Sequence, residues 1–442
     1  MFLPSSPLPR LRRRGAFARG IDITRNASVE LKNAAKSFNS VMESVCDNML
    51  VEIRPSKFQN GLYTKHNVLK GQVLLSVPPQ LCISVDFGKE NGLSLPSGGS
   101  WPRLQAGLEA PDPLTWDLLM SLALLDCISG NGGQFWMDYS SSVFPEKQSL
   151  LLPMCWPMPL LRELQHPEIM EGALKQQARL SAMFPDLMAQ ENEDVPSWFQ
   201  WAFACVRSRS VQLSRDHFAL VPFLDLANHG IEANCDFAHM VEGDSKVPTT
   251  QLVALQDMPQ GTELLLSYTG PNGYTNQRMM AQYGFVIPGG NPGDRIIFKN
   301  RQGLERSEGV LKLERFQDVL GDQIFLEIIS GKDAYGYAAL KSLPIGDENS
   351  DGSSADDGDN LGCASSLRDE CKITLEESAS TLQEDEELLA KLIKHRQPDL
   401  ATEDSIAPLV HKDERFLSAL MYRIERKRLL HATSSILSLY IA

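Results

Sequence analysis

Two stretches of this sequence, residues 221–230 and 264–285, place polar side chains directly after apolar runs, and they constrain the fold more than any other feature. The polar residues concerned are Asp225, Asn228, His229, Tyr268 and Tyr283. Buried polar groups are costly unless they are paired. The two stretches therefore predict either a site for a polar ligand or a fully hydrogen-bonded internal network.

The composition is that of a soluble globular protein, with 43% hydrophobic and 22% charged residues. A chain of 442 residues predicts two or three domains. With 42 basic and 56 acidic residues the net charge is −14, which disfavours broad binding to nucleic acid or to an anionic membrane. No apolar run reaches the roughly 18 residues that span a bilayer.

The eight cysteines are scattered, and no pair has the CxxC spacing of a zinc site. We expect reduced, mostly buried thiols. His229, Cys235 and His239 are close in sequence, but their spacing is poor and a second ligand pair is missing, so no metal site is predicted. A Cys-His hydrolase that uses Cys205 or Cys235 would need an oxyanion or nucleophile-elbow motif, which this sequence lacks.

Residues 1–28 are rich in arginine, contain serine, and have Asp22 as their first acidic residue. This composition is typical of an organellar transit peptide, for a plastid or a mitochondrion. The alternative is a disordered basic tail on a protein of the cytoplasm or nucleus. In either case the segment lies outside the predicted fold.

Strand-like and helix-like patterns occur in separate blocks. Residues 51–86 read as short strands, with a turn expected at Gly71. Gly61 fits either a turn, which we favour, or a backbone that approaches a ligand. A helical block follows at about 110–213, and its first helix is expected to stop at Gly130. Residues 249–268 are typical of a β-hairpin. The region 295–442 is mostly helical, except for an acidic, apolar-poor insertion at about 345–370 that we predict to be disordered.

The order of these motifs resembles that of SET-domain methyltransferases, most closely the subgroup typified by the Rubisco large-subunit methyltransferase. The matching segments are GLYTK, LKGQVLLSVP, VPFLDLANH, ELLLSY and NQRMMAQYGF. The resemblance covers nearly all of the chain after about residue 45. It implies an α+β fold: a β-rich SET domain with a pseudoknot at 45–290, interrupted by the helical insertion, and an all-α substrate-binding domain at 295–442.

The resemblance also implies roles for the matching residues. Asn228 and His229 match the motif that holds S-adenosylmethionine (SAM), and Tyr268 matches the tyrosine at the methyl-transfer channel, so it is the catalytic candidate. Tyr283 matches the second aromatic wall of that channel. The remaining cofactor-binding candidates are Asp225, Arg209, Gly61 and Leu62. Taken singly, such residues more often cap, pack or form ion pairs.

Methyl transfer from a sulfonium to nitrogen is an in-line displacement that needs a neutral acceptor nitrogen about 3 Å from the methyl group. The pKa of lysine, ~10.4 in water, falls in a narrow apolar channel beside the sulfonium, because desolvation and the like charge both disfavour the ammonium form. We expect the Tyr268 hydroxyl to align the amine rather than to act as a general base. The expected activity is therefore SAM-dependent N-methylation of lysine in a non-histone protein, with histidine left open as the acceptor.

One loop departs from the family pattern, which usually reads GxG or EGLG. Residues 58–62 are FQNGL, without the acidic residue and the first glycine. The alternative to an active enzyme is therefore a catalytically weak or inactive scaffold that binds partner proteins through its helical tail. For the enzyme, the expected partners are SAM and a substrate protein docked by that tail, on a monomer that binds no metal, nucleic acid or membrane.

Overall fold

The computed structural model describes residues 39–40, 42–43, 49–55, 60–89, 92–96, 99–190, 192, 194–240, 249–269, 273–298, 311–345, 357–395 and 413–442. The predicted transit peptide and residues 58 and 59 of the FQNGL loop lie outside this range. The chain forms two compact units. A β-rich unit comprises residues 1–148, 181–192 and 196–268, and a helical unit comprises residues 149–180, 193–195 and 269–442.

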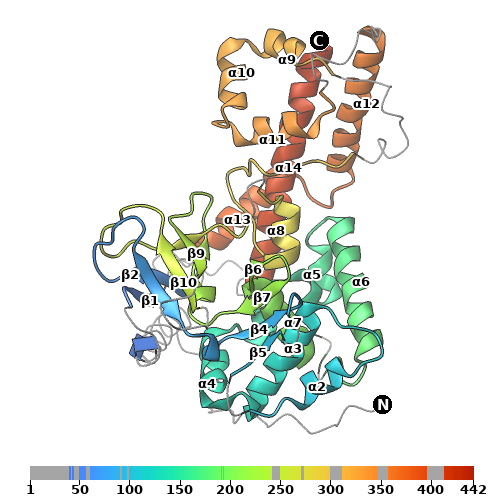
Figure 1. Ribbon diagram of the computed structural model, residues 1–442. Coiled ribbons are helices and arrows are strands. Elements are labelled where there is room, and N and C mark those ends of the chain that lie inside the picture. Colours follow the sequence, from blue (N-terminus) through green and yellow to red (C-terminus); the bar gives the residue numbers. More distant parts are fainter. Residues whose placement is uncertain are drawn as a thin grey trace. The chain divides into compact units, whose positions relative to one another are not determined.

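The described strands belong to the β-rich unit and form four small sheets (Figure 1). Their orders are β1 (Val51–Pro55) with β2 (Asn60–Thr64); β3 (Val73–Val77), β10 (Thr249–Ala254), β9 (Cys235–Met240); β8 (Asn228–His229) with β11 (Leu265–Leu266); and β5 (Leu93–Ser94), β4 (Ile83–Asp86), β7 (His217–Leu220), β6 (Val211–Ser214). The chain has small sheets in one unit and only helices among the described regular elements of the other, which confirms the predicted α+β class.

The turn at Gly71 is as predicted, with a φ of 81°, and it leads into β3, where Leu74 and Leu75 are fully buried. Two other local predictions are wrong. Gly61 lies inside β2, opposite Arg54, rather than at a turn. The hairpin at 249–268 does not form, because β10 pairs with β3 and β9 whereas β11 pairs in parallel with β8. Alternating hydrophobicity identifies strands but not their partners.

The helices of the β-rich unit are α2 (Pro102–Leu108), α3 (Trp116–Asp126), α4 (Gly133–Val143) and α7 (Trp198–Arg209). Helix α3 runs into a π-helical turn at Cys127–Asn131, where Gly130 has a φ of 93° and ends the helix as expected. Helix α7 starts with a capping box in which Ser197 and Gln200 satisfy each other's backbone amides. Helix α7 is buried along most of its length and carries Arg209 at its last position.

The described helices of the helical unit are α5 (Met158–Arg162), α6 (Pro167–Met183, up to residue 180), α8 (Asn276–Tyr283), α9 (Leu313–Leu320), α10 (Asp322–Ile329), α11 (Ala334–Ser342), α12 (Asp357–Glu376), α13 (Leu382–His395) and α14 (Glu414–Ile441). Helix α14 is its axis, and α9, α11, α12 and α13 pack against it (Figure 1). This helix is long enough to collect apolar contacts from helices that are too short to be stable alone.

The disordered insertion predicted at about 345–370 requires correction, because residues from Asp357 onward form α12. Ala364, Leu367 and Cys371 are buried and recur at helical spacing, so they give α12 an apolar stripe that packs in the core around α14. The acidic composition of the whole segment hides this stripe. Residues 346–356 lie outside the described part of the chain.

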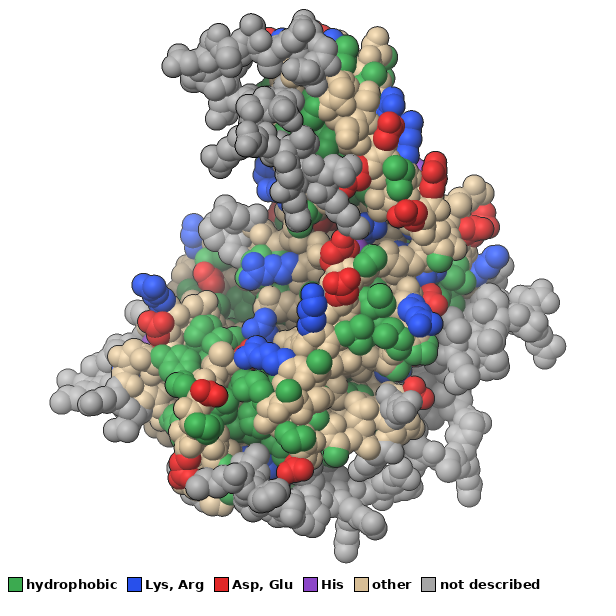
Figure 2. Space-filling model, turned by 90° about the vertical axis from the view of Figure 1, so that its right-hand side faces the viewer, with side chains coloured by type: hydrophobic (Ala, Val, Ile, Leu, Met, Phe, Trp, Pro, Cys, Tyr) green, Lys and Arg blue, Asp and Glu red, His purple; other side chains and the backbone are tan. Residues whose placement is uncertain are grey.

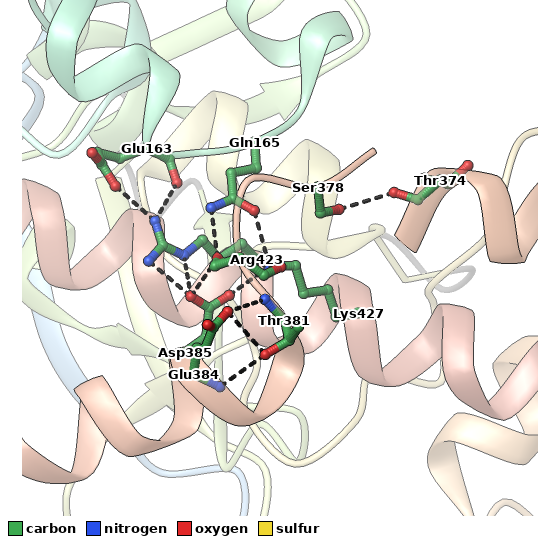
Figure 3. Close-up of polar contacts among 10 residues, drawn as sticks. Glu163, Gln165, Thr374, Ser378, Thr381, Glu384, Asp385, Arg423 and Lys427 are labelled. Carbon is green, nitrogen blue, oxygen red and sulfur yellow. Dashed lines mark hydrogen bonds and ion pairs between the residues drawn. The ribbon is translucent and has the colours of Figure 1, made fainter. Parts of the chain in front are cut away.

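Buried charges fasten α13 to α14 (Figure 3). The carboxylate of Asp385, with a side chain only 1% exposed, accepts hydrogen bonds from Arg423 Nε at 3.0 Å and from Lys427 Nζ at 2.7 Å. Arg423 also reaches Glu163 Oε2 at 2.7 Å, and Lys427 reaches Gln165 Oε1 at 2.9 Å. Removing one member of such a network leaves an uncompensated buried charge, which is strongly destabilising.

The two compact units divide the chain differently from the predicted domains. Residues 149–180, within the predicted helical insertion, and residues 269–290, at the end of the predicted SET domain, both belong to the helical unit. The reason is packing, since α5 and α8 both contact α14.

Figure 2 shows both signs of charge on one face of the molecule, lying among hydrophobic side chains. Among the described residues, no helix combines the length and the hydropathy needed to cross a bilayer.

Candidate active site

The parallel pair β8 and β11 joins the two polar stretches that stand out in the sequence. Leu265 lies opposite Asn228, and Leu266 lies opposite His229. The amide of Gly230 extends the ladder by donating to the carbonyl of Leu266 at 3.0 Å. Parallel strands place their carboxyl ends at the same edge. The residues that follow each strand therefore meet there.

Tyr268 contacts the 227–229 segment at two points. Its backbone amide donates to His229 Nδ1 at 3.2 Å, and its hydroxyl donates to the carbonyl of Ala227 at 2.7 Å. The centroids of the Tyr268 and His229 rings are 5.4 Å apart. Burial lowers the pKa of His229, which favours the neutral ring that can accept this amide hydrogen bond. The structure thus brings together His229 and Tyr268, as the sequence pattern predicts.

Asn228 is held by a residue that the sequence pattern does not identify. Its side-chain amide donates to Glu263 Oε1 at 2.8 Å. The backbone around Glu263 is itself fixed, because Asn234 donates to the Glu263 carbonyl and accepts from the Leu265 amide, both at 2.8 Å. Glu263 carries no motif signal, since a glutamate entering a strand reads as an exposed position.

Asp225 and Arg209 form a buried ion pair behind this segment. Arg209 Nη1 lies 3.2 Å from Asp225 Oδ2, and the two side chains are 11% and 1% exposed. Burial raises the pKa of Asp225, while the charge of Arg209 and the hydroxyl of Tyr139 favour its ionised form. The structure therefore brings these two predicted cofactor residues together, but directs their charges at each other.

Tyr139 is the third member of the cluster, and the sequence gives no sign of it. Its fully buried hydroxyl donates to Asp225 Oδ1 and accepts from the backbone amide of Phe223 at 2.7 Å. Phe223 has a φ of 70°, a left-handed conformation that costs a bulky residue free energy and persists only when its surroundings enforce it. Tyr139 supplies that enforcement two residues before Asp225. It lies on α4, in an aromatic stretch that reads as ordinary core.

Gly61 and Leu62 lie on β2, alongside the strand segment that carries Glu263. The Leu62 carbonyl accepts from the Leu264 amide at 2.8 Å, and the Leu62 side chain is fully buried. The neighbouring Asn60 has a buried side-chain oxygen that accepts no hydrogen bond within the described structure. An unsatisfied buried acceptor is costly. It is thus a candidate contact for a ligand that carries a donor.

Tyr283 belongs to the helical unit, whereas the seven other candidates belong to the β-rich unit. It is the last residue of α8, and Gly284 caps the helix with a φ of 78°. The Tyr283 hydroxyl accepts from Gln282 Nε2 at 3.2 Å, and its ring centroid is 6.0 Å from that of Phe285.

A cavity of about 540 Å³ opens elsewhere in the helical unit, and none of the eight predicted site residues lines it. Its wall includes the buried groups of His166, Tyr422 and Asp294. Burial raises the pKa of Asp294 to about 6. Within the described chain, no group of three or more His, Cys, Asp or Glu side chains is arranged to hold a metal ion.

Comparison with known families identifies the β-rich region. Residues 59–269 match the model of the SET domain. The chain carries a SET domain. The β8–β11 pair, the Asp225 cluster and β2 all lie within this SET domain, and the resemblance on which the motifs were interpreted is confirmed.

Curated relatives share this domain at low identity. The chain is 24% identical over 353 residues to the protein Plastid Transcriptionally Active 14 of Arabidopsis thaliana, covering 75% of this chain and 67% of that protein. It is 23% identical over 367 residues to the chloroplastic ribulose-1,5-bisphosphate carboxylase/oxygenase large subunit N-methyltransferase of Nicotiana tabacum, covering 74% and 69%. It is 25% identical over 253 residues to SET domain-containing protein 4 of Mus musculus, covering 51% and 52%.

Solved structures share the fold over most of this chain, including both the SET domain and the helical region. The SET domain of LSMT bound to lysine and AdoHcy aligns with a TM-score of 0.52 at 17% identity, covering 94% of this chain and 92% of that one. Rubisco LSMT bound to AdoMet aligns with the same TM-score at 18% identity, covering 92% and 91%. At this identity the likeness establishes the fold alone.

Proposed function

We propose that this chain is a SAM-dependent protein-lysine N-methyltransferase. The observation that carries the proposal is the double contact of Tyr268 with the 227–229 segment, through its amide and its hydroxyl. This contact joins the SAM-holding motif to the channel tyrosine in one rigid element. The proposal is supported by the SET-domain match and by structural neighbours solved with AdoMet, or with lysine and AdoHcy.

The residues of the SET domain fit the cofactor. Asn228 and His229 would hold its adenosyl part, and the backbone of β2 at Gly61 and Leu62 would line its amino-acid end. The Leu62 carbonyl already accepts from Leu264, whereas the Asn60 side-chain oxygen accepts no hydrogen bond from the described residues. We therefore assign this oxygen as the acceptor of the cofactor amine. Asn60 would thereby compensate for the acidic residue that the FQNGL loop lacks.

Asp225 and Arg209 would shape the pocket from behind rather than by direct charge contact. Each already uses its charge on the other, and Tyr139 fastens Asp225 to the backbone at Phe223. The cluster fixes the turn that leads into Asn228 and His229. Preorganisation of this kind reduces the free energy spent on ordering a site when the ligand binds.

Tyr268 would align the acceptor amine. Its hydroxyl proton is committed to the Ala227 carbonyl, so the phenolic oxygen presents its lone pairs as acceptors. A neutral lysine amine that donates one N–H to this oxygen has its own lone pair free to attack. The cofactor supplies the methyl group on its sulfonium. The same oxygen can accept weak C–H hydrogen bonds from such a polarised methyl. The lysine would release its proton to water before the attack, because desolvation in the channel lowers its pKa.

We further propose that the substrate is a non-histone protein and that the helical unit docks it to the monomeric enzyme. Helix α10 exposes large apolar side chains that a partner could cover, namely Ile324, Leu326 and Ile329. Histidine stays open as an alternative acceptor. We place the protein in the plastid, on the basis of its arginine-rich residues 1–28 and of the plastid and chloroplast relatives. Imaging a fluorescent fusion of residues 1–28 separates plastid from mitochondrial or cytoplasmic location.

The second candidate function is a scaffold without catalysis, which the departure at residues 58–62 favours. Calorimetry of the purified chain with SAM separates the two. Heat of binding, followed by transfer of labelled methyl to a protein in a plastid extract, supports the enzyme. No heat and no thermal shift at millimolar SAM supports the scaffold.

For an active enzyme, Tyr268→Phe tests the role of the hydroxyl. We expect turnover to fall by about tenfold or more, a loss of at least about 1.4 kcal/mol in transition-state stabilisation. SAM affinity should fall much less than turnover, because the variant loses the hydroxyl bond to Ala227 but keeps the bond from the Tyr268 amide to His229. Tyr337→Phe in the helical unit is the matched control. Unchanged turnover in Tyr268→Phe would remove the assigned role.

A further inference from the structure

The segment that follows Tyr283 is anchored on α14. The carbonyl of Gly284 accepts a hydrogen bond from Ser418 Oγ. The carboxylate of Glu425 accepts the backbone amides of Gly289 at 3.2 Å and of Gly290 at 3.1 Å. Residues 418 and 425 are two helical turns apart, so they lie on one face of α14. Both ends of the 284–290 segment are therefore fixed to the same helix.

Glu425, which anchors the segment, is buried, and its carboxylate accepts hydrogen bonds from further donors. Glu425 is only 3% exposed, and it also accepts from the Tyr335 hydroxyl at 2.7 Å and from Arg428 Nη1 at 3.0 Å. The chain passes so close to α11 that a Cβ added at Gly290 would lie 2.8 Å from Ala334 Cβ. The segment has no room to shift toward α11 while these contacts persist.

The anchored segment also makes contacts at both ends of α8, the helix that carries Tyr283 as its last residue. At its end, Gly284 adopts the left-handed conformation, and a Cβ there would lie 2.2 Å from the carbonyl oxygen of Leu151. At its start, the side chain of Asn276 accepts the amide of Ile287 at 2.8 Å. An eight-residue helix is too short to be stable by itself. Its position is therefore set by these contacts.

We propose that Ser418 and Glu425 are positioning residues for Tyr283, because they hold the segment that follows it on α14. The inference rests on the proposed function and on the role that the resemblance to SET-domain methyltransferases implies for Tyr283, that of the second aromatic wall. It gives the helical tail a part in the transfer step, beyond docking the substrate. If the Tyr283 ring moved by about 1 Å, the acceptor would be misaligned with the methyl group, and a displacement of this size lowers rates steeply.

Hydrogen exchange of the full chain tests the anchor without reference to activity. Glu425→Gln keeps the shape but leaves one acceptor oxygen for two backbone amides, and Ser418→Ala removes the hydroxyl. Each variant should speed exchange at amides 283–291 by about fivefold or more. Two controls remove buried groups of the helical unit whose partners in the described structure lie outside residues 284–290: Asp385→Asn, and Thr433→Ala, whose hydroxyl donates to the Leu429 carbonyl. Unchanged exchange in both test variants would overturn the inference.

Kinetics tests the consequence for catalysis. Glu425→Gln should lower kcat by about fivefold or more while it leaves the dissociation constant of SAM within about twofold. In a Tyr283→Ala background the same substitution should cause no further fall, because its effect passes through the missing ring. An equal fall in both backgrounds would show that Glu425 acts elsewhere. A wild-type chain that neither binds SAM nor transfers methyl would reject the proposed function, while the exchange experiment would still decide the anchor.

Discussion

Tyr139→Phe tests the most specific claim about the site, that a buried hydroxyl shapes the SAM-holding segment. The substitution keeps the ring, which packs edge-on against Phe223 and Phe144, and removes two hydrogen bonds. An orphaned backbone amide at Phe223 costs about 1–3 kcal/mol, and the buried carboxylate of Asp225 loses a charge-assisted bond of about 1.5–3 kcal/mol. Because the two losses share one site and are not additive, we expect a total of about 2–4 kcal/mol.

The assay is a thermal melt combined with calorimetry of SAM binding. A loss of this size should lower the Tm by about 5–15 °C for a unit of this size. It should also weaken SAM affinity by about tenfold or more, since Phe223 would no longer be held at a φ of 70° and the turn into Asn228 would relax. The matched control is Tyr422→Phe, which removes an equally buried hydroxyl, bonded to His166 in the helical unit.

The control should lose stability to a similar degree and keep its SAM affinity. The reasoning would be refuted if Tyr139→Phe melted within about 1 °C of the wild type, since a buried amide and a buried carboxylate would then have lost a partner at no cost. Equal loss of SAM affinity in both variants would also contradict it, because the effect would then be general loosening.

Two further predictions concern the helical unit. Gly284→Ala should destabilise the chain by at least about 3 kcal/mol more than Gly331→Ala. The two glycines have nearly the same φ, 78° and 77°, but only at Gly284 would the added Cβ lie 2.2 Å from a carbonyl oxygen. Equal Tm values for the two variants would contradict this. Asp294→Asn should gain stability relative to wild type as the pH rises from about 4 to 7, by up to about 3 kcal/mol. Burial raises the folded-state pKa of Asp294 from 3.8 to about 6, so the wild type loses stability as this carboxyl ionises between these pH values. A Tm difference between variant and wild type that does not vary with pH would contradict this prediction.

The elements of the site were predictable where the chemistry is local. Asn228, His229 and Tyr268 follow apolar strands, and strand ends at a common edge bring such residues together. Some of these polar residues form an internal network, and others form the proposed ligand site. Asp225 and Arg209 are members of an internal network with Tyr139, whereas His229 and Tyr268 form the element on which transfer is proposed.

Other features were unpredictable because their cause lies far away in the chain. The hairpin expected at 249–268 was wrong because β11 finds its partner in β8 rather than in β10. The helix at Asp357–Glu376 was missed because its few apolar residues are stabilised by α14, which begins 57 residues after α12 begins. Tyr139 was missed because it lies in an aromatic stretch, where a tyrosine that only packs in the core has the same sequence context as one that positions a neighbouring segment.

The sequence by itself determined the fold class, the SET-type order of motifs and the identity of the residues that follow each strand. These follow from hydrophobic periodicity and from side-chain chemistry, which are properties of short segments. Only the tertiary structure decided what each polar group is bonded to. It paired Asp225 with Arg209 and bound the segment after Tyr283 to Ser418 and Glu425. It also buried the side-chain oxygen of Asn60, which has no hydrogen-bond partner among the residues that the structure describes. Hydrogen-bond partners depend on which distant segments share a core, and a burial cost arises only once that core has formed.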